Sequence, residues 1–170
     1  TVLFNDSIEG NILMGRPAAT HDEVVEASKV ANAHTFIMES PEGYATNIGD
    51  RGSKLSGGQR QKVYLAMALA QETEYILLDE PTTYLDISHQ VSLMHLLRRL
   101  TEDGKGIAAV MHDLPLAMTY ADEIWVMREG RIAACGTPME ICESGILRKL
   151  FGVAVGCENG EFFCRLKSSD

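Results

Sequence analysis

The sequence predicts an α/β protein with a parallel sheet, because three short apolar runs alternate with helical patterns. The runs at 75–78, 107–111 and 123–127 are rich in apolar residues, as is typical of strands that are buried on both faces. Segments 88–100 and 113–121, which lie between the runs, show helical patterns. Strands that alternate with helices in this way favour a sheet of parallel strands joined by helical crossovers.

Two further helices are expected before the first strand. Apolar residues recur at helical spacing over 21–36, where Thr20 is a candidate N-cap. A second helix is expected over 56–71, after a polar loop at 44–54. The chain should therefore begin with a helical part and continue into the strand-rich part.

Two hairpins are expected after the crossovers. Glu129-Gly130 predicts a turn into a strand at 131–134, and Asn159-Gly160 predicts a small hairpin near the end of the sequence. On this pattern we divide the chain into three parts: 1–72, 73–152 and 153–170.

Composition argues against several classes of protein. The chain has 170 residues, of which 45% are hydrophobic and 23% are charged, as expected of one globular domain. The net charge of −9 argues against a nucleic-acid partner, because binding phosphates over a surface needs clustered Lys and Arg. No apolar run approaches the ~18–20 residues that cross a bilayer, which favours a cytoplasmic location. The four cysteines show no C-x-x-C spacing and are expected to be reduced and structural rather than metal-binding: Cys135, Cys142, Cys157 and Cys164.

The strongest local signal is the run Leu55-Ser56-Gly57-Gly58-Gln59. Two glycines at a helix start let a backbone approach a phosphate, while the helix N-terminus supplies free N–H groups and Ser56 supplies a hydroxyl donor. A glycine-containing N-cap without any ligand would give the same local pattern. The run is therefore a candidate phosphate site whose interpretation depends on the residues downstream of it.

Acidic residues come directly after the first strand, at the strand end where ligands bind in parallel sheets. Asp79 is placed to help hold Mg2+, and Glu80 can polarise an attacking water. His112 ends the next strand, so it can reach the same edge of the sheet and contact a phosphate oxygen. Structural explanations stand beside these roles: the two acids as turn residues, His112 as a structural histidine and Asp86 as a helix cap. The order of the features, rather than any one of them, favours a nucleotide site.

In this order the motifs resemble those of the ATP-binding-cassette (ABC) ATPases over nearly the whole chain. LSGGQ at 55–59 looks like their signature motif, and YILLDE at 75–80 looks like their Walker B strand with its catalytic glutamate. Leu85-Asp86 looks like their D-loop and His112 like their switch histidine. The resemblance implies an incomplete P-loop NTPase (RecA-like) parallel sheet together with the ABC helical subdomain.

The resemblance also implies a role for each candidate residue. Two such domains face each other in the family, and each signature motif closes over ATP that the other domain holds. Asp79 would hold Mg2+ through water, whereas Glu80 and His112 would be catalytic on the nucleotide of their own domain. The residues that would bind nucleotide in trans are Ser56, Gly57, Gly58 and Gln59.

The family's ATP-gripping Walker A loop, G-x-x-x-x-G-K-[ST], does not occur in the sequence. The only Gly-Lys pair, Gly104-Lys105, lacks the glycine five residues earlier. We therefore expect 1–72 to be the helical signature subdomain and 73–152 to be the second half of the ATPase core, with the Walker A strand and an amino-terminal segment missing. The second and third strands would flank that strand, so they are expected to rearrange, to exchange with a second chain or to cause poor solubility.

Two parts of the chain resemble different transporters. Residues 2–53 look like multidrug and lipid exporters, whereas residues from about 63 to 150 look like importers of iron–siderophores and cobalamin. The resemblance implies a partial ATP-binding and ATP-hydrolysing subunit of an ABC transporter, with iron–siderophore uptake as one candidate process. The alternative is a non-catalytic fragment or an engineered chimera that cannot bind ATP alone. Soluble ABC proteins of DNA repair or translation form a third, weaker class.

The same resemblance implies the partners of the chain. A second ABC nucleotide-binding domain, in a homodimer or a heterodimer, would complete the sites for ATP and Mg2+. Transmembrane permease subunits would contact residues 1–52, and the chain would lie in the cytoplasm as a peripheral protein on the inner face of the cell membrane. No nucleic acid is expected.

Overall fold

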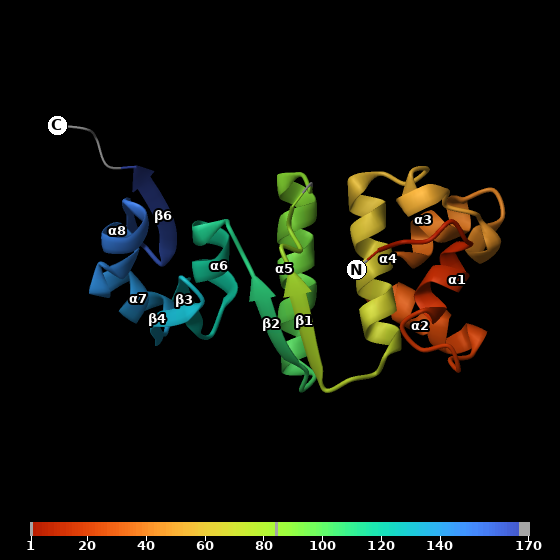
Figure 1. Cartoon of the computed structure of the whole chain (residues 1–170), viewed down its shortest axis with the longest axis horizontal. Coiled ribbons are helices and arrows are strands. Elements are labelled where there is room, and N and C mark those ends of the chain that lie inside the picture. Colours follow the sequence, from red (N-terminus) through yellow and green to blue (C-terminus); the bar gives the residue numbers. More distant parts are fainter. Residues whose placement is uncertain (1, 84, 167–170) are drawn as a thin grey trace. The chain divides into compact units, whose positions relative to one another are not determined.

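Helices form the first part of the chain in the computed structural model, which describes residues 2–83 and 85–166. The long helix α4 packs against α1 and α2 (Figure 1). Ile8, Val24 and Val63, one from each of these helices, are completely buried. The bounds are α1 Ile8–Leu13, α2 His21–Val30, α3 His34–Glu39 and α4 Gly57–Ala70, with two 3-10 turns, η1 Gly43–Ala45 and η2 Asp50–Gly52.

The predicted helix over 56–71 is confirmed by α4, but the single helix predicted over 21–36 is wrong. Asn32 adopts a left-handed backbone with φ 55° and ends α2. The amide of Ala33 then donates to the carbonyl of Ser28 at 2.7 Å, which closes the helix in the manner of a Schellman motif. Because the helical spacing of apolar residues continues across this break, periodicity alone does not reveal it.

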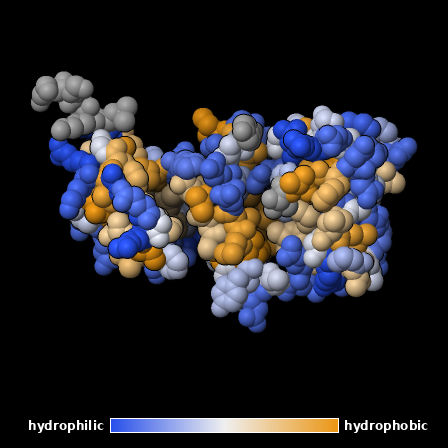
Figure 2. All heavy atoms as spheres, viewed as in Figure 1, coloured by the Kyte–Doolittle hydropathy of each residue, from blue (hydrophilic) through white to orange (hydrophobic). Residues whose placement is uncertain are grey.

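A two-stranded parallel sheet comes after the helices. β1 (Tyr75–Asp79) and β2 (Gly106–Val110) pair in register from their first residues to their last, and α5 (Ile87–Glu102) connects them. This arrangement confirms the parallel α/β unit that the first two apolar runs predict. Tyr75, Leu77 and Val110 are 73%, 80% and 56% exposed, so one face of the sheet is an apolar surface (Figure 2).

The last part of the chain builds its own small core. The buried side chains of Met118, Val126, Ile141 and Leu147 pack together. Both predicted hairpins are confirmed, by β3 with β4 and by β5 with β6; residues 167–170 of the predicted tail lie outside the described part. The bounds are α6 Leu114–Tyr120, β3 Ile124–Arg128, β4 Arg131–Gly136, α7 Pro138–Ser144, α8 Ile146–Phe151, β5 Val153–Glu158 and β6 Glu161–Leu166.

The chain divides into two compact units, Thr1–Val110 and Met111–Asp170. Within the described residues, β2 pairs only with β1, and β3 pairs only with β4. β1 and β2 keep their parallel register, but the third apolar run is not a parallel strand, because β3 pairs antiparallel with β4. A rearranged sheet, exchange with a second chain or poor solubility stays a prediction. No helix in the described ranges is both long and apolar enough to cross a membrane.

The break between α2 and α3 gives a test of the fold. We expect Asn32→Ala to lower the free energy of unfolding by about 1 kcal/mol, because a left-handed backbone is unfavourable for a residue with a Cβ and no local polar group. Asn32 is exposed, so no packing is lost in this variant. Urea unfolding followed by far-UV circular dichroism measures the change. Asn32→Gly is the matched control and should be closer to wild type; equal losses in both variants would contradict the backbone explanation.

Candidate nucleotide-binding site

The start of α4 is fixed by a reciprocal pair of hydrogen bonds. Ser56 is the N-cap, and its Oγ accepts a hydrogen bond from the Gln59 amide at 3.2 Å, while Gln59 Oε1 accepts one from the Ser56 amide at 2.9 Å. Gly57 and Gly58 are the first two helical residues, so their amides have no carbonyl acceptor earlier in the helix. These two amides are therefore able to donate to an anion at a helix N-terminus.

A tightly packed glycine holds the loop that enters this helix. Gly52 is buried and has φ 69°, and a Cβ there would lie 2.9 Å from the side chain of Leu3 and 3.2 Å from that of Arg60. Arg60 Nη1 also donates to the carbonyl of Leu55 at 2.9 Å. Glycine suits both the backbone conformation and the space, so we expect the position of Ser56 to depend on Gly52.

The same loop is bonded to the segment at the start of the chain. The amide of Ile48 donates to the carbonyl of Asp6 at 3.0 Å. The buried side chain of Asn11 bonds the backbone of Phe4 in both directions, accepting at 2.7 Å and donating at 3.1 Å. Residues 2–53 and the signature helix therefore form one packed body.

At the end of β1 the two acidic residues differ in environment. Asp79 is exposed, whereas Glu80 is half-buried and has a left-handed backbone with φ 47°. The Glu80 amide donates to the carbonyl of Val110 at 3.0 Å, and the Thr83 hydroxyl donates to Glu80 Oε2 at 3.1 Å. The hydrogen bond from Thr83 holds the carboxylate that the sequence marks as a catalytic candidate.

Asp86, the predicted D-loop residue, caps α5. Asp86 accepts hydrogen bonds from the His89 amide at 2.9 Å and from the Ser88 hydroxyl at 2.8 Å, and it pairs with the imidazole of His89 at 2.8 Å. These contacts, the His89 amide first, lower the pKa of the Asp86 carboxyl to about 2. Gln90 also holds the turn before α5, since its Nε2 donates to the carbonyl of Leu85 at 3.2 Å.

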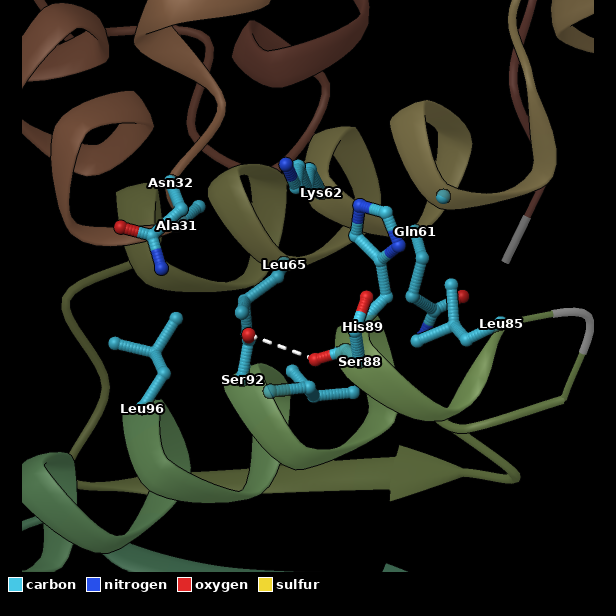
Figure 3. A pocket seen from close by; sticks show the side chains of 12 residues that line it. Ala31, Asn32, Gln61, Lys62, Leu65, Leu85, Ser88, His89, Ser92 and Leu96 are labelled. Atoms are coloured by element: carbon cyan, nitrogen blue, oxygen red, sulfur yellow. Dashed lines mark hydrogen bonds between the residues drawn. The ribbon is translucent and has the colours of Figure 1, made fainter.

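The structure brings Gly58 of the predicted signature motif and Leu85 of the predicted D-loop together at one pocket of ≈ 210 Å³. Gly58 and Lys62 line the α4 side, whereas Leu85 and His89 line the α5 side; Lys62, Leu85 and His89 are labelled in Figure 3. A Cβ on Gly58 would lie 3.7 Å from Leu85, an ordinary van der Waals distance. Gly58 therefore lies beside the residue that precedes Asp86.

Of the predicted site residues, Gly58 alone lines this pocket. The predicted site residues that do not line it are Ser56, Gly57, Gln59, Asp79, Glu80 and Asp86. His112 is an exposed residue of the second unit, so its convergence with Glu80 stays a prediction. In the described ranges no group of three or more His, Cys, Asp or Glu side chains could hold a metal ion. Mg2+ in nucleotide sites is bound by one or two carboxylates together with waters and substrate phosphates, so the exposed Asp79 fits such a role.

Sequence reasoning missed three residues that position this site: Arg60, Thr83 and Gln90. Each acts through a hydrogen bond to a group on a neighbouring turn, and each is an ordinary polar residue in the sequence. No motif or spacing marks them. The nearest signal is the location of Arg60 and Gln90 in the first turns of α4 and α5, where side chains can reach the preceding loop.

Comparisons with known proteins agree with this geometry. A family model described as ABC transporter matches residues 5–83. Two proteins of Staphylococcus aureus, from strains NCTC 8325 and Mu50 / ATCC 700699, each named "Putative multidrug export ATP-binding/permease protein", are 42% identical over 153 residues, covering 89% of this chain and 26% of each protein. A solved bacterial Atm1-family ABC exporter with ATP bound is 35% identical, with a TM-score of 0.77, over 85% of this chain and 25% of its own.

Fold and motif order together define part of an ABC transporter ATPase domain, with a mixed α/β ABC ATPase-like fold. The chain is homologous to exporter-type ABC proteins. It spans about a quarter of the length of these relatives.

The Asp86 cap gives a pH-dependent prediction. The folded-state pKa of about 2 lies below the ordinary value of 3.8, so the stability that this carboxylate contributes is present above about pH 4 and is lost as the pH falls toward about 2. We expect Asp86→Ala to lower the urea midpoint at neutral pH, and the difference from wild type to shrink in acid. Asp86→Asn keeps a cap without the charge and serves as control. A difference that stays constant down to about pH 2 would contradict the assignment.

Proposed function

We propose that this chain is part of the ATP-binding and ATP-hydrolysing component of an ABC transporter that exports its substrate. The observation that carries the proposal is the fold that the chain shares, with 35% sequence identity, with an ATP-bound exporter. Within that fold the signature turn and the Asp79-Glu80 strand end each have a geometry suited to a nucleotide phosphate or its metal.

In this proposal the signature motif acts on nucleotide held by a second ABC domain. Gly57 and Gly58 present open amides, Ser56 presents an exposed hydroxyl, and Gln59 keeps the cap in place. The first turn of α4 reads Gly-Gly-Gln-Arg, so no carboxylate there repels a phosphate, and the helix dipole adds positive potential. Binding at this surface draws the two domains together around the γ-phosphate.

The remaining site residues act on the nucleotide of their own domain. Asp79 would hold Mg2+ through water, and a bound ion would supply positive charge to neutralise the β- and γ-phosphates. Glu80, oriented by Thr83, accepts a hydrogen bond from the attacking water and polarises it. His112 contacts a γ-phosphate oxygen, and Asp86 sets the D-loop at the boundary with the second domain.

Export is favoured over uptake by the extent of the matches. The aligned 153 residues cover 89% of the chain, so they include most of residues 63–150, the part that resembles importers. Residues 2–53 are also packed continuously onto the signature helix, which supports one exporter-like body rather than a chimera. Iron–siderophore uptake therefore has only the local resemblance of the later segment in its favour.

The proposed partners are a second ABC ATPase domain and transmembrane segments of the transporter. The names of the Staphylococcus relatives, ATP-binding/permease proteins, combine both functions in one chain. We propose that the loop at 46–52, bonded to the start of the chain, contacts those segments at the inner face of the membrane. Exchange of this loop should then uncouple ATP hydrolysis from transport in the assembled transporter.

A nucleotide titration of the chain alone tells apart two possibilities. The chain either binds ATP by itself or only contributes residues to ATP sites in an assembly. The sequence holds no G-x-x-x-x-G-K-[ST] loop, which supplies most contacts to the β- and γ-phosphates. We therefore expect a fluorescent ATP analogue with Mg2+ to show no saturable binding up to roughly millimolar concentration, the weak end of specific affinities. Glu80→Gln, titrated alongside, should behave as wild type. Tight Mg2+-dependent binding would mean that other residues of this chain bind the phosphates. It would overturn the proposal that the chain contributes to ATP sites only in an assembly.

A further inference from the structure

The pocket between α4 and α5 has an apolar floor and a polar rim. Buried aliphatic side chains form the floor: Ala31, Leu65, Leu93 and Leu96. The rim is made of exposed or half-buried polar residues: Asn32, Gln61, Lys62, Ser88, His89 and Ser92. The labelled side chains in Figure 3 come from α4, from α5 with the turn before it and from the end of α2. With ≈ 210 Å³ the pocket is smaller than the roughly 300–1,000 Å³ of sites for drug-sized molecules, so it suits a smaller ligand.

Helical spacing gives the pocket the form of a groove along two helices. The lining residues of α4 are spaced so that each has another three or four positions away, and so are those of α5, which places each set on one face of its helix. From Gly58 to Leu65 the axis of α4 rises about 10 Å, a length that an extended chain such as that of octanoate can match. A groove of this form, with an aliphatic floor, fits a linear hydrocarbon chain.

Lys62 gives the groove a positive charge that no described residue pairs with. The chain carries 24 Asp and Glu residues, but none of the described residues that line the pocket is acidic. Lys62 forms no ion pair or hydrogen bond with a described residue. The carboxylate of Asp86 lies outside the lining and is held by two residues of the rim, Ser88 and His89. An anion in the groove can therefore pair with Lys62 without displacing an existing partner.

We propose that this groove binds a small linear monocarboxylate, with its carboxylate at Lys62 and its hydrocarbon chain on the aliphatic floor. Lys62 is half-buried, and its ammonium group can donate charge-assisted hydrogen bonds to a carboxylate. The side-chain amide of Gln61 can donate a further one. The hydrocarbon chain leaves water for the floor, which favours binding. This site goes beyond the proposed function, because it needs neither nucleotide nor a second ABC domain.

The test measures the affinity of the whole chain for octanoate by isothermal titration calorimetry, with octanamide as the uncharged ligand of the same length. We expect saturable octanoate binding with a Kd of roughly 0.1–1 mM, as suits a small ligand. Octanamide should bind at least about threefold more weakly, because it cannot form an ion pair with Lys62. Neither titration contains nucleotide or Mg2+, so the result does not depend on the proposed ATP chemistry.

Two pairs of variants locate the site. Lys62→Met keeps an apolar side chain and removes the charge, so its affinity for octanoate should fall about three- to fivefold while its affinity for octanamide stays the same. Lys149 is an exposed lysine of α8 in the second unit, so Lys149→Met is the matched control and should bind both ligands as wild type does. Ser92→Phe adds a ring at an exposed position of the rim and should abolish octanoate binding, whereas Ser92→Ala should keep it.

The exposed apolar face of β1 and β2 is another surface on which octanoate could bind. Leu77→Gln makes that face less apolar without changing the groove, so it should leave octanoate binding unchanged. Three outcomes would overturn the proposal: no saturable octanoate binding up to about 10 mM, equal affinity of wild type for octanamide and octanoate, or a loss of binding in Leu77→Gln that Ser92→Phe does not share. Far-UV circular dichroism checks the fold of each variant. The two titrations of the wild-type chain decide the proposal even if Ser92→Phe fails to fold.

Discussion

The start of α4 depends on a single small residue, Gly52, whose missing side chain lets Leu3 and Arg60 close around the loop that carries Ser56. Any other residue here would strain the left-handed backbone and would displace the side chain of Leu3 or Arg60, so glycine suits this path best. Arg60 then holds Leu55 by its carbonyl, and the Ser56–Gln59 pair fixes the first turn. The open amides of the signature motif are thus placed by tertiary packing rather than by the motif itself.

Within the first unit, the predicted signature turn and the predicted D-loop lie side by side. The pocket between α4 and α5 places Gly58 beside Leu85, at an ordinary van der Waals distance. The apolar face of β1 and β2, by contrast, has no described neighbour in the first unit that covers Leu77 and Val110, and both side chains are well exposed. Such a face is typical of a surface that another element covers in an assembly.

Much of this could be predicted from the sequence, and the remainder has identifiable physical causes. The two parallel strands, α4, α5 and both hairpins are predictable from apolar runs, caps and Gly-containing turns. The break at Asn32 could not be foreseen, because a left-handed residue leaves no trace in hydrophobic periodicity. The left-handed backbone of Glu80 and the side-chain bonds of Thr83 and Gln90 depend on contacts between turns, which a linear pattern does not encode. The candidate site residues were found through motif order, and their joint action on one nucleotide stays a prediction.

The central claim is that this chain contributes a signature motif to ATP held by another domain. Its most direct test mixes the chain with the isolated ATP-binding part of one of the Staphylococcus aureus ATP-binding/permease relatives and measures association by analytical ultracentrifugation with and without ATP and Mg2+. The Gly58→Asp variant adds a carboxylate where a Cβ has room, so it should fold yet repel a phosphate, whereas Glu80→Gln leaves the signature intact. We expect ATP-dependent association for wild type and for Glu80→Gln, and its loss in Gly58→Asp. Failure of the wild-type chain to associate, or association that survives Gly58→Asp unchanged, would contradict the claim.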